Sequence, residues 1–369
     1  MNFSYWEIKN WFTDVDYTIV GSGIVGLHTS LRLRERFPES KILIIEKGVL
    51  PQGASTKNAG FACFGSISEI LDDLKSHSEQ DVFNLIQKRY EGLQILRKRL
   101  GDNNLDYKPY GGYEVFLNND NDYEKCLKNI PLINDLLKPL FKTNVFVKEL
   151  DKFGFQKIHK HLIFNPFEAQ IDTGNMMQNL LKIAVSKNIL ILNQQMVTNF
   201  IENKNEVQVV LDKFSFKTKK LLFATNGFAE KITNQHVKPA RAQVIITEPI
   251  DNLTIKGTFH IDKGYYYFRN FENRILLGGG RNLDFEGETT TEFGQTELIQ
   301  KKLEQLLHEV ILPDKKVTIA HRWSGIMGLG DSKKPIVSQL SENVYCGVRL
   351  GGMGVAIGSI VGTELADLI

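Results

Sequence analysis

The stretch YTIVGSGIVGLHTSLRLRERFPESKILIIEKG, residues 17–48, decides the fold. An apolar run turns through Gly21-Ser22-Gly23, passes Gly26 into a helical segment, and a second apolar run ends on Glu46. This order of strand, glycine turn, helix, strand and acid is typical of a dinucleotide site, because the glycines permit a tight turn, close approach of a pyrophosphate and close helix packing. The helix directs free N–H groups at the phosphates, and Glu46 stands where an acid accepts bonds from ribose hydroxyls. The acid disfavours a 2′-phosphate but does not separate NAD from FAD.

Composition narrows the class of protein. The 369 residues are enough for two domains, and a formal net charge of +2 gives no reason to expect a nucleic-acid or membrane-surface partner. The three cysteines, Cys63, Cys126 and Cys346, form no CxxC pair, which indicates a reduced, cytoplasmic compartment. No run of residues has the length and apolarity of a membrane span, so we expect none.

Hydrophobic spacing predicts the elements between these motifs. Residues 69–100 read as helices, and residues 121–141 as a helix broken near Pro131 and Pro139. A strand over 317–323 is expected to end in a glycine turn. In the last helix, 355–369, small residues recur on one side, which predicts close packing on a sheet.

Motifs along the whole chain resemble those of the D-amino-acid oxidase-like superfamily of FAD-dependent oxidoreductases, and within it glycine/sarcosine oxidases, D-amino-acid dehydrogenases and γ-glutamylputrescine oxidoreductases. The matching segments are DYTIVGSGIVGL (16–27), IIEKG (44–48), GASTKNAG (53–60), ATNGF (224–228), YYYFR (265–269), RILLGGG (274–280), RWSGI (322–326) and GGMGVAIG (351–358). The first two are common to dinucleotide folds. GASTKNAG and the final glycine turn before a helix are far more specific.

The resemblance implies an α/β fold, with a Rossmann-type FAD-binding domain and an inserted substrate domain of antiparallel β-sheet plus helices. The FAD-binding domain is expected to be discontinuous, over 1–80, 165–235 and 320–369. The substrate domain is then expected over 81–164 and 236–319.

The resemblance also implies which residues hold FAD, from the nucleotide half to the electron-poor edge of the ring. They are Gly21, Ser22, Gly23, Ile24, Val25, Gly26, Glu46, Lys47, Ser55, Thr56, Asn58, Ala59, Gly60, Val197, Thr225, Asn226, Gly227, Gly325, Gly352, Met353, Gly354 and Val355. A flavin that accepts two electrons becomes anionic near N1 and C2=O, and the amino end of the last helix would supply partial positive charge there.

Substrate residues are expected to orient the substrate rather than to act as an acid–base pair, because flavin needs little side-chain help to oxidise a C–N bond. Strand alternation puts Tyr265, Tyr267 and Arg269 on one face, and an arginine beside phenols suits a carboxylate. Arg349, just before the final glycine turn, is the second candidate, and the sequence does not decide between the two arginines. We interpret His28, His260 and His321 as structural, and predict no metal site.

Departures from the family pattern qualify these expectations. Amino-acid oxidases often carry an arginine just after the RWSGI-type segment, whereas this chain has Met327, which favours an amine, or an acid held from elsewhere. The histidine or cysteine that attaches flavin covalently in some relatives is missing near Asn58 and in the loop 329–331, so we expect non-covalent FAD. The oxygen-activating lysine of sarcosine-oxidising relatives is replaced by Leu276 and Leu277, which leaves oxygen open as electron acceptor.

The sequence therefore predicts an FAD-dependent amine or amino-acid oxidoreductase, oxidase or dehydrogenase. Hydride would pass from the substrate to flavin N5, and the imine would then be hydrolysed. Two alternatives stay open: a non-catalytic flavin-binding module and a flavin monooxygenase. A tRNA-modifying oxidoreductase is disfavoured by the near-neutral charge.

Overall fold

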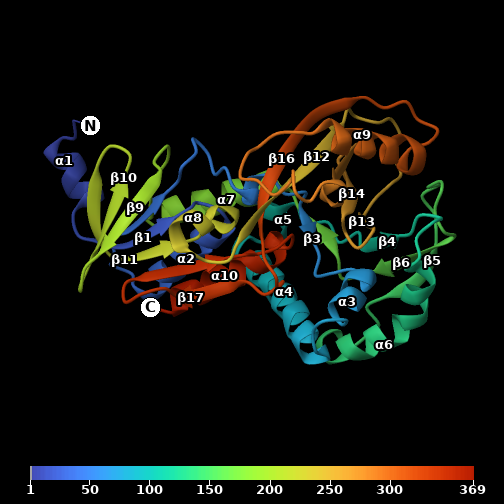
Figure 1. Ribbon diagram of the computed structural model, residues 1–369, viewed down its shortest axis with the longest axis horizontal. Helices are drawn as coiled ribbons and strands as arrows, with labels where there is room; N and C mark the ends of the chain where they lie inside the picture. The colour runs from blue at the N-terminus through green and yellow to red at the C-terminus, as the bar shows by residue number, and fades with distance from the viewer. Residues whose placement is uncertain (1) are drawn as a thin grey trace.

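The computed structural model describes residues 2–369 and contains two large sheets, which occupy the two ends of the molecule (Figure 1). Both chain termini lie beside the first sheet, on the left of the figure. The second sheet, with β12, β14 and β16 labelled, lies on the right. Segments that are far apart in the sequence therefore meet in the region between the two sheets.

The first sheet carries the nucleotide motif. Its strands, in spatial order, are β17 (Ile336–Gln339), β18 (Val344–Val348), β11 (Ser215–Phe223), β1 (Val15–Val20), β2 (Ile42–Ile45) and β8 (Leu190–Leu192), with β9 (Val197–Glu202) and β10 (Val207–Leu211) added through β11. The strands from β18 to β8 are parallel. Every residue of β2 is buried, which explains its unbroken apolar sequence. Since parallel strands end at one edge, the turns after β1, β2 and β11 open together.

The second sheet is antiparallel except for the β4–β13 pair. Its spatial order is β16 (Ile319–Leu329), β12 (Lys238–Thr247), β15 (Arg274–Gly279), β14 (Tyr266–Phe271), β13 (Thr258–Ile261), β4 (Gly112–Val115), β6 (His161–Asn165) and β5 (Val147–Leu150). A separate ribbon joins β3 (Phe61–Ala62) to β7 (Ala169–Gln170).

Strand β16 differs from the prediction. The expected turn after residue 323 is wrong: β16 continues to Leu329, because β12 pairs with it from Lys238 to Thr247. Residues 320–329, which the predicted boundaries put in the FAD-binding domain, thus belong to the second sheet. The remaining domain boundaries stay a prediction.

The helices are α1 (Tyr5–Glu7), α2 (Ile24–Arg36), α3 (Ile67–Asp73), α4 (Glu79–Leu100), α5 (Asp102–Leu105), α6 (Tyr123–Phe141), α7 (Thr173–Ser186), α8 (Glu230–Thr233), α9 (Glu297–Leu306) and α10 (Gly354–Asp367). Ser78 separates α3 from α4, because its Oγ accepts the Asp81 amide at 3.1 Å and so caps the second helix. The predicted break in α6 is wrong, since the helix contains both Pro131 and Pro139. Its apolar face, including Ile133 and Leu137, is buried in a hydrophobic cluster, and this burial stabilises the helix across both prolines.

The small residues Ser359 and Gly362 of α10 face helices, contrary to the expectation that this side packs on a sheet, whereas Val361 and Leu365 of the same helix lie against Gly347 of β18. A Cβ at Gly362 would lie 2.6 Å from the carbonyl oxygen of Val25 in α2, so the two backbones approach closely there. On α4, a Cβ at Gly92 would lie 2.1 Å from the Ala356 carbonyl oxygen, and Ser359 Oγ donates to the Gly92 carbonyl. These contacts fix the amino ends of α2 and α10 relative to each other. Figure 1 shows α4 extending from α10 towards α6.

Within residues 2–369, no helix combines the length and the apolarity that crossing a bilayer requires.

We predict that Gly362→Val lowers the free energy of unfolding by about 2 kcal/mol, because overpacking a tight contact costs about 1–3 kcal/mol. The new side chain would meet both the Val25 carbonyl and, at 2.7 Å, His28 Cβ. Chemical denaturation measures this change. Gly53→Ala is the control, since nothing lies within 4 Å of a Cβ at Gly53. A Gly362→Val protein as stable as the control would contradict the packing account.

Candidate active site

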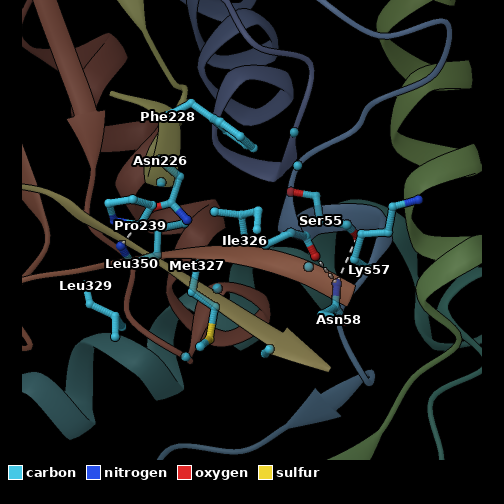
Figure 2. Close-up of a pocket in the computed structure, with 18 of the residues that line it drawn as sticks. Ser55, Lys57, Asn58, Asn226, Phe228, Pro239, Ile326, Met327, Leu329 and Leu350 are labelled. Atoms are coloured by element: carbon cyan, nitrogen blue, oxygen red, sulfur yellow. Dashed lines mark hydrogen bonds between the residues drawn. The ribbon is translucent and has the colours of Figure 1, made fainter. Parts of the chain in front are cut away.

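One cavity of about 1630 Å³ runs between the two sheets, and segments from the beginning, middle and end of the chain line it (Figure 2). Most of the predicted cofactor residues lie on its wall. They are Gly21, Gly23, Ile24, Val25, Glu46, Lys47, Ser55, Asn58, Ala59, Val197, Thr225, Asn226, Gly227, Gly325, Gly352, Met353, Gly354 and Val355. The nucleotide turn and the final glycine turn thus open onto the same space.

Four predicted cofactor residues do not line the cavity: Ser22, Gly26, Thr56 and Gly60. A Cβ at Gly26 would lie 1.9 Å from the Gly21 carbonyl oxygen, so this glycine serves the packing of helix on turn. Thr56 Oγ1 donates to the Pro51 carbonyl at 2.7 Å. These four residues lie behind the residues that line the cavity. Their position does not support the predicted contact with FAD.

The turn after β1 brings three segments of the chain close together at the amino end of α2. Gly21 has φ +105°, and a Cβ there would lie 2.8 Å from the Ala224 carbonyl oxygen. A Cβ at Gly23 would lie 2.8 Å from Ser55 Oγ, which accepts the Ile24 amide at 2.9 Å. The glycines therefore keep both the backbone of β11 and the loop of Ser55 close to the amino end of α2.

The Glu46 carboxylate is fixed at the cavity wall by the turn itself. Its Oε2 accepts the backbone amide of Ser22 at 3.0 Å and the Ser22 hydroxyl at 2.8 Å, while Oε1 accepts the Gly48 amide at 3.0 Å. A carboxylate offers about four lone-pair sites, so acceptor capacity remains for ribose hydroxyls. Ser22, predicted as a cofactor residue, instead orients this acid.

The loop of residues 54–60 is held by its own asparagine. Asn58 Nδ2 donates to the carbonyls of Ala54 and Ser55 at 3.1 and 2.8 Å, and its Oδ1 accepts the Thr173 hydroxyl at 2.9 Å. From the second sheet, Trp323 Nε1 donates to the Lys57 carbonyl at 2.9 Å. Figure 2 shows Ser55, Lys57 and Asn58 together on one side of the cavity.

The opposite side is formed by the end of β11 and the turn before α10. Asn226 Oδ1 accepts the Leu350 amide at 3.1 Å, as the dashed line in Figure 2 marks. Helix α10 begins at Gly354 directly at the cavity, so its free amides and positive dipole end face that space. Thr225 Oγ1 is buried there with no partner in the described part of the chain. Together with the glycine turn after β1 and Glu46, these donors fit FAD.

Tyr265 and Tyr267, which the sequence suggested as substrate residues, both line the cavity, Tyr267 from β14 and Tyr265 from the residue just before that strand. Tyr267 lies directly across from Gly278 of β15, and a Cβ at that glycine would be 2.8 Å from the phenol oxygen. Burial raises the pKa of Tyr267 to about 12. The ring also meets Phe61 edge-on, with centroids 5.6 Å apart. Tyr267 therefore presents a neutral, fixed aromatic face.

The structure places the side chains of Arg269 and Arg349 outside the cavity. Arg269 lies beneath the loop of Gly60, where a Cβ would be 2.9 Å from Arg269 Nη2, and burial lowers the pKa of Arg269 to about 10. Arg349 has φ +64°, and its Nε donates to the Lys334 carbonyl at 3.0 Å. Neither position supports the predicted grip on a substrate carboxylate.

Arg281 is a lining residue that the sequence analysis missed. It follows β15 and stacks over Tyr265 and Phe285, with its guanidinium carbon 5.3 and 5.1 Å from the ring centroids. Within residues 2–369, no carboxylate lies within ion-pair distance of it. By contrast, Lys263 pairs with Asp122 at 3.0 Å. The β14–β15 hairpin is the feature that could have revealed this residue. Gly279 pairs with Tyr266, so Arg281, two residues after Gly279, lies at the same end of the hairpin as Tyr265.

Other missed lining residues include Cys63 and His260. The Cys63 thiol donates to Met353 Sδ at 3.6 Å, and burial raises the pKa of this thiol well above its usual value. A thiol held neutral in this way is a poor nucleophile. His260, which the sequence analysis interpreted as structural, comes from β13.

Comparisons with known proteins agree with this architecture. The chain is 20% identical to the probable oxidoreductase OrdL of Haemophilus influenzae, over 100% of this chain and 90% of that protein. It is 24% identical to γ-glutamylputrescine oxidoreductase of Escherichia coli, over 96% and 83%. The crystal structure of glycine oxidase from Bacillus cereus superposes with a TM-score of 0.76 at 16% identity, covering 96% of each chain, which shows a shared fold.

The family model described as FAD dependent oxidoreductase, DAO, matches residues 16–368. The nucleotide turn, the acid after β2 and the glycine turn before α10 all fall within this match and line the cavity. The chain is a member of the DAO family of FAD-dependent oxidoreductases.

Proposed function

We propose that this enzyme oxidises a C–N bond of a small amine or amino acid, with hydride transfer to N5 of non-covalently bound FAD and hydrolysis of the resulting imine. The observation that carries the proposal is the single cavity, which is shared by the nucleotide turn, the amino end of α10 and the tyrosines at β14. Bound FAD would supply the two-electron acceptor. The protein residues orient the substrate and exclude water from it.

The substrate end of the cavity suits a small molecule with an apolar portion. Tyr267 and Phe61 supply aromatic faces, and Val244 lies in the same buried cluster. Such walls hold the reacting carbon in one orientation, and this positioning accelerates the reaction of the bound substrate. Tyr265 borders this region on the outer side, where its ring supports Arg281.

Arg281 is the residue that we assign to a substrate carboxylate, in place of Arg269 and Arg349. Burial lowers the pKa of Arg281, so the charge is incompletely solvated, and a carboxylate would compensate it with two parallel hydrogen bonds. Met327, which also lines the cavity, favours an amine substrate or an acid held by a residue elsewhere, and Arg281 is our candidate for the second possibility.

Attachment of FAD without a covalent bond is supported by the state of Cys63, whose thiol is neutral and engaged with Met353. The three cysteines, Cys63, Cys126 and Cys346, are all free and buried, which supports a reducing, cytoplasmic location. The electron acceptor is oxygen or another oxidant, and the first test below separates these.

We predict that the purified protein is yellow and that acid precipitation releases all of its flavin as FAD. One of glycine, sarcosine, L-proline, putrescine and γ-glutamylputrescine should bleach the flavin anaerobically, because the cavity orients an amine at the flavin. Absorbance near 450 nm measures this, and readmitted air distinguishes an oxidase from a dehydrogenase. Flavin that no amine bleaches would favour a non-catalytic module, and flavin that remains on the precipitate would contradict non-covalent binding.

We predict that Arg281→Met raises the KM for a carboxylated amine of this panel by about 10- to 100-fold, since a hydrogen bond to a charged group contributes about 1.5–3 kcal/mol. The KM for putrescine, which has no carboxylate, should change little. Arg274→Met is the matched control, because Arg274 lies on the same hairpin and donates to the Thr247 carbonyl.

Arg349→Met decides between the two assignments. If Arg349→Met raises the KM for the carboxylated amine and Arg281→Met does not, the carboxylate site belongs to Arg349 and our placement is wrong.

A further inference from the structure

His260 and Glu168 form a buried pair at the cavity wall that the proposed function does not use. His260 Nε2 lies 3.0 Å from Glu168 Oε2, and the two side chains are 8% and 2% exposed. The His260 side chain lines the cavity, whereas Glu168 lies behind it. A buried carboxylate–imidazole pair that opens to an active-site cavity is an arrangement suited to proton transfer.

The register of the second sheet puts His260 beside the substrate wall. His260 on β13 is the direct cross-strand partner of Tyr267 on β14, so both side chains project to the same face. Phe61 meets both rings edge-on, at centroid distances of 5.3 Å to His260 and 5.6 Å to Tyr267. The imidazole is therefore a neighbour of any substrate that packs on Tyr267.

The hydrogen-bond network assigns the imidazole tautomer. Glu168 Oε2 also accepts the Thr258 hydroxyl at 3.1 Å, and Asn165 Nδ2 lies 3.4 Å from Oε1. An ionised carboxylate can only accept, so His260 Nε2 carries the hydrogen in this pair. Neutral His260 then has its lone pair on Nδ1, which has no hydrogen-bond partner between residues 2 and 369.

Charged groups on every side act on this imidazole. Burial lowers the pKa of His260, but Glu168, Glu114 and Glu69 raise it, and the net pKa is above the ordinary value. Glu114 lies on β4, next to His260 in the sheet, and burial raises its own pKa to about 7. Arg89 and Lys333 partly balance Glu69, at 3.6 and 3.0 Å. The nearby Cys63 thiol is neutral.

We propose that His260 Nδ1 is the proton acceptor for the substrate ammonium group, and that Glu168 is the residue that positions it. The inference rests on the proposed function, since it requires an amine substrate. Alkylammonium groups have a pKa of about 10, so less than about 1% of such an amine is neutral at pH 7. An acceptor inside the cavity takes up that proton within the complex, so the amine can bind as the ammonium and lose its proton there.

The proton and electron balance is closed. An N–H proton of the ammonium moves to His260 Nδ1, and the electron pair of that bond stays on the amine nitrogen. This pair forms the C=N bond as the hydride leaves the adjacent carbon, with bound FAD as the oxidant. Glu168 balances the charge on the imidazolium, which returns its proton to water through the cavity.

A metal site is the competing use of these residues. Ligand atoms of Cys63, Glu168 and His260 lie within 4.8 Å of one another. However, the Cys63 thiol is protonated and donates a hydrogen bond to Met353 Sδ, and Glu168 Oε2 already accepts two hydrogen bonds. The geometry favours the proton-transfer pair.

The first test needs no substrate. Histidine-labelled, FAD-loaded protein is titrated by NMR, and the His260 signal is identified among the eight histidines by its loss in His260→Gln. We expect Nε2–H in the neutral form and a pKa above the ordinary value that falls in Glu168→Gln, because loss of the carboxylate destabilises the imidazolium. An Nδ1–H tautomer, or a pKa unchanged in Glu168→Gln, overturns the pairing. One equivalent of bound zinc that Cys63→Ala removes overturns it in favour of a metal.

The second test follows anaerobic bleaching against pH with each panel amine that reduces the wild-type flavin. The limiting rate should rise with pH to a plateau, and His260→Gln should lose that limb and at least 10-fold of the rate, while Glu168→Gln moves the limb to lower pH. His321→Gln is the control, since His321 is an exposed histidine on β16. Flavin content and circular dichroism establish that each variant is folded.

Two results of this second test overturn the proton-acceptor role alone: a parental profile in His260→Gln, or a wild-type rate that falls with rising pH, which would make His260 a cationic anchor. If no amine bleaches the wild-type flavin, the proposed function fails and the inference fails with it. The NMR result then shows separately whether the His260–Glu168 pairing exists.

Discussion

The close crossing of α10 over α2 is the constraint on which the active site depends. Gly362 brings the backbone of α10 against the Val25 carbonyl, and Gly26 in turn brings α2 against the Gly21 carbonyl. With both contacts made, the amino ends of two helices far apart in sequence open onto one cavity. A residue with a side chain at either glycine would separate the turn after β1 from the final glycine turn. The small residues of these helices therefore set the distance that one dinucleotide must span.

The second sheet contributes chemistry through one row of cross-strand neighbours. Glu114, His260, Tyr267 and Gly278 follow one another across β4, β13, β14 and β15. Gly278 leaves room for the phenol, and the phenol and Phe61 keep the imidazole at the cavity wall. In this way the sheet places a titratable group, an aromatic face and, at the end of the same hairpin, Arg281 around one substrate volume.

Local motifs could be interpreted from the sequence because each carries its physical reason within a few residues. The glycine turn, Glu46 and the glycine turn before α10 are of this kind, and all three line the cavity. Alternation correctly put Tyr267 on the wall. It failed for Arg269, because whether that face reaches the cavity depends on the loop of Gly60 covering it. Arg349 could not be placed either, since its left-handed backbone turns the side chain towards Lys334. Glu168 is 92 residues from His260, and no spacing rule joins them.

The central claim is that one FAD spans both ends of this cavity, and a crystal structure of the FAD-loaded protein tests it most directly. The account predicts ribose hydroxyls on the Glu46 carboxylate and the pyrimidine edge of the flavin within hydrogen-bond distance of the amides that begin α10. A nucleotide bound at Glu46 whose other end lies away from residues 352–355 would contradict it.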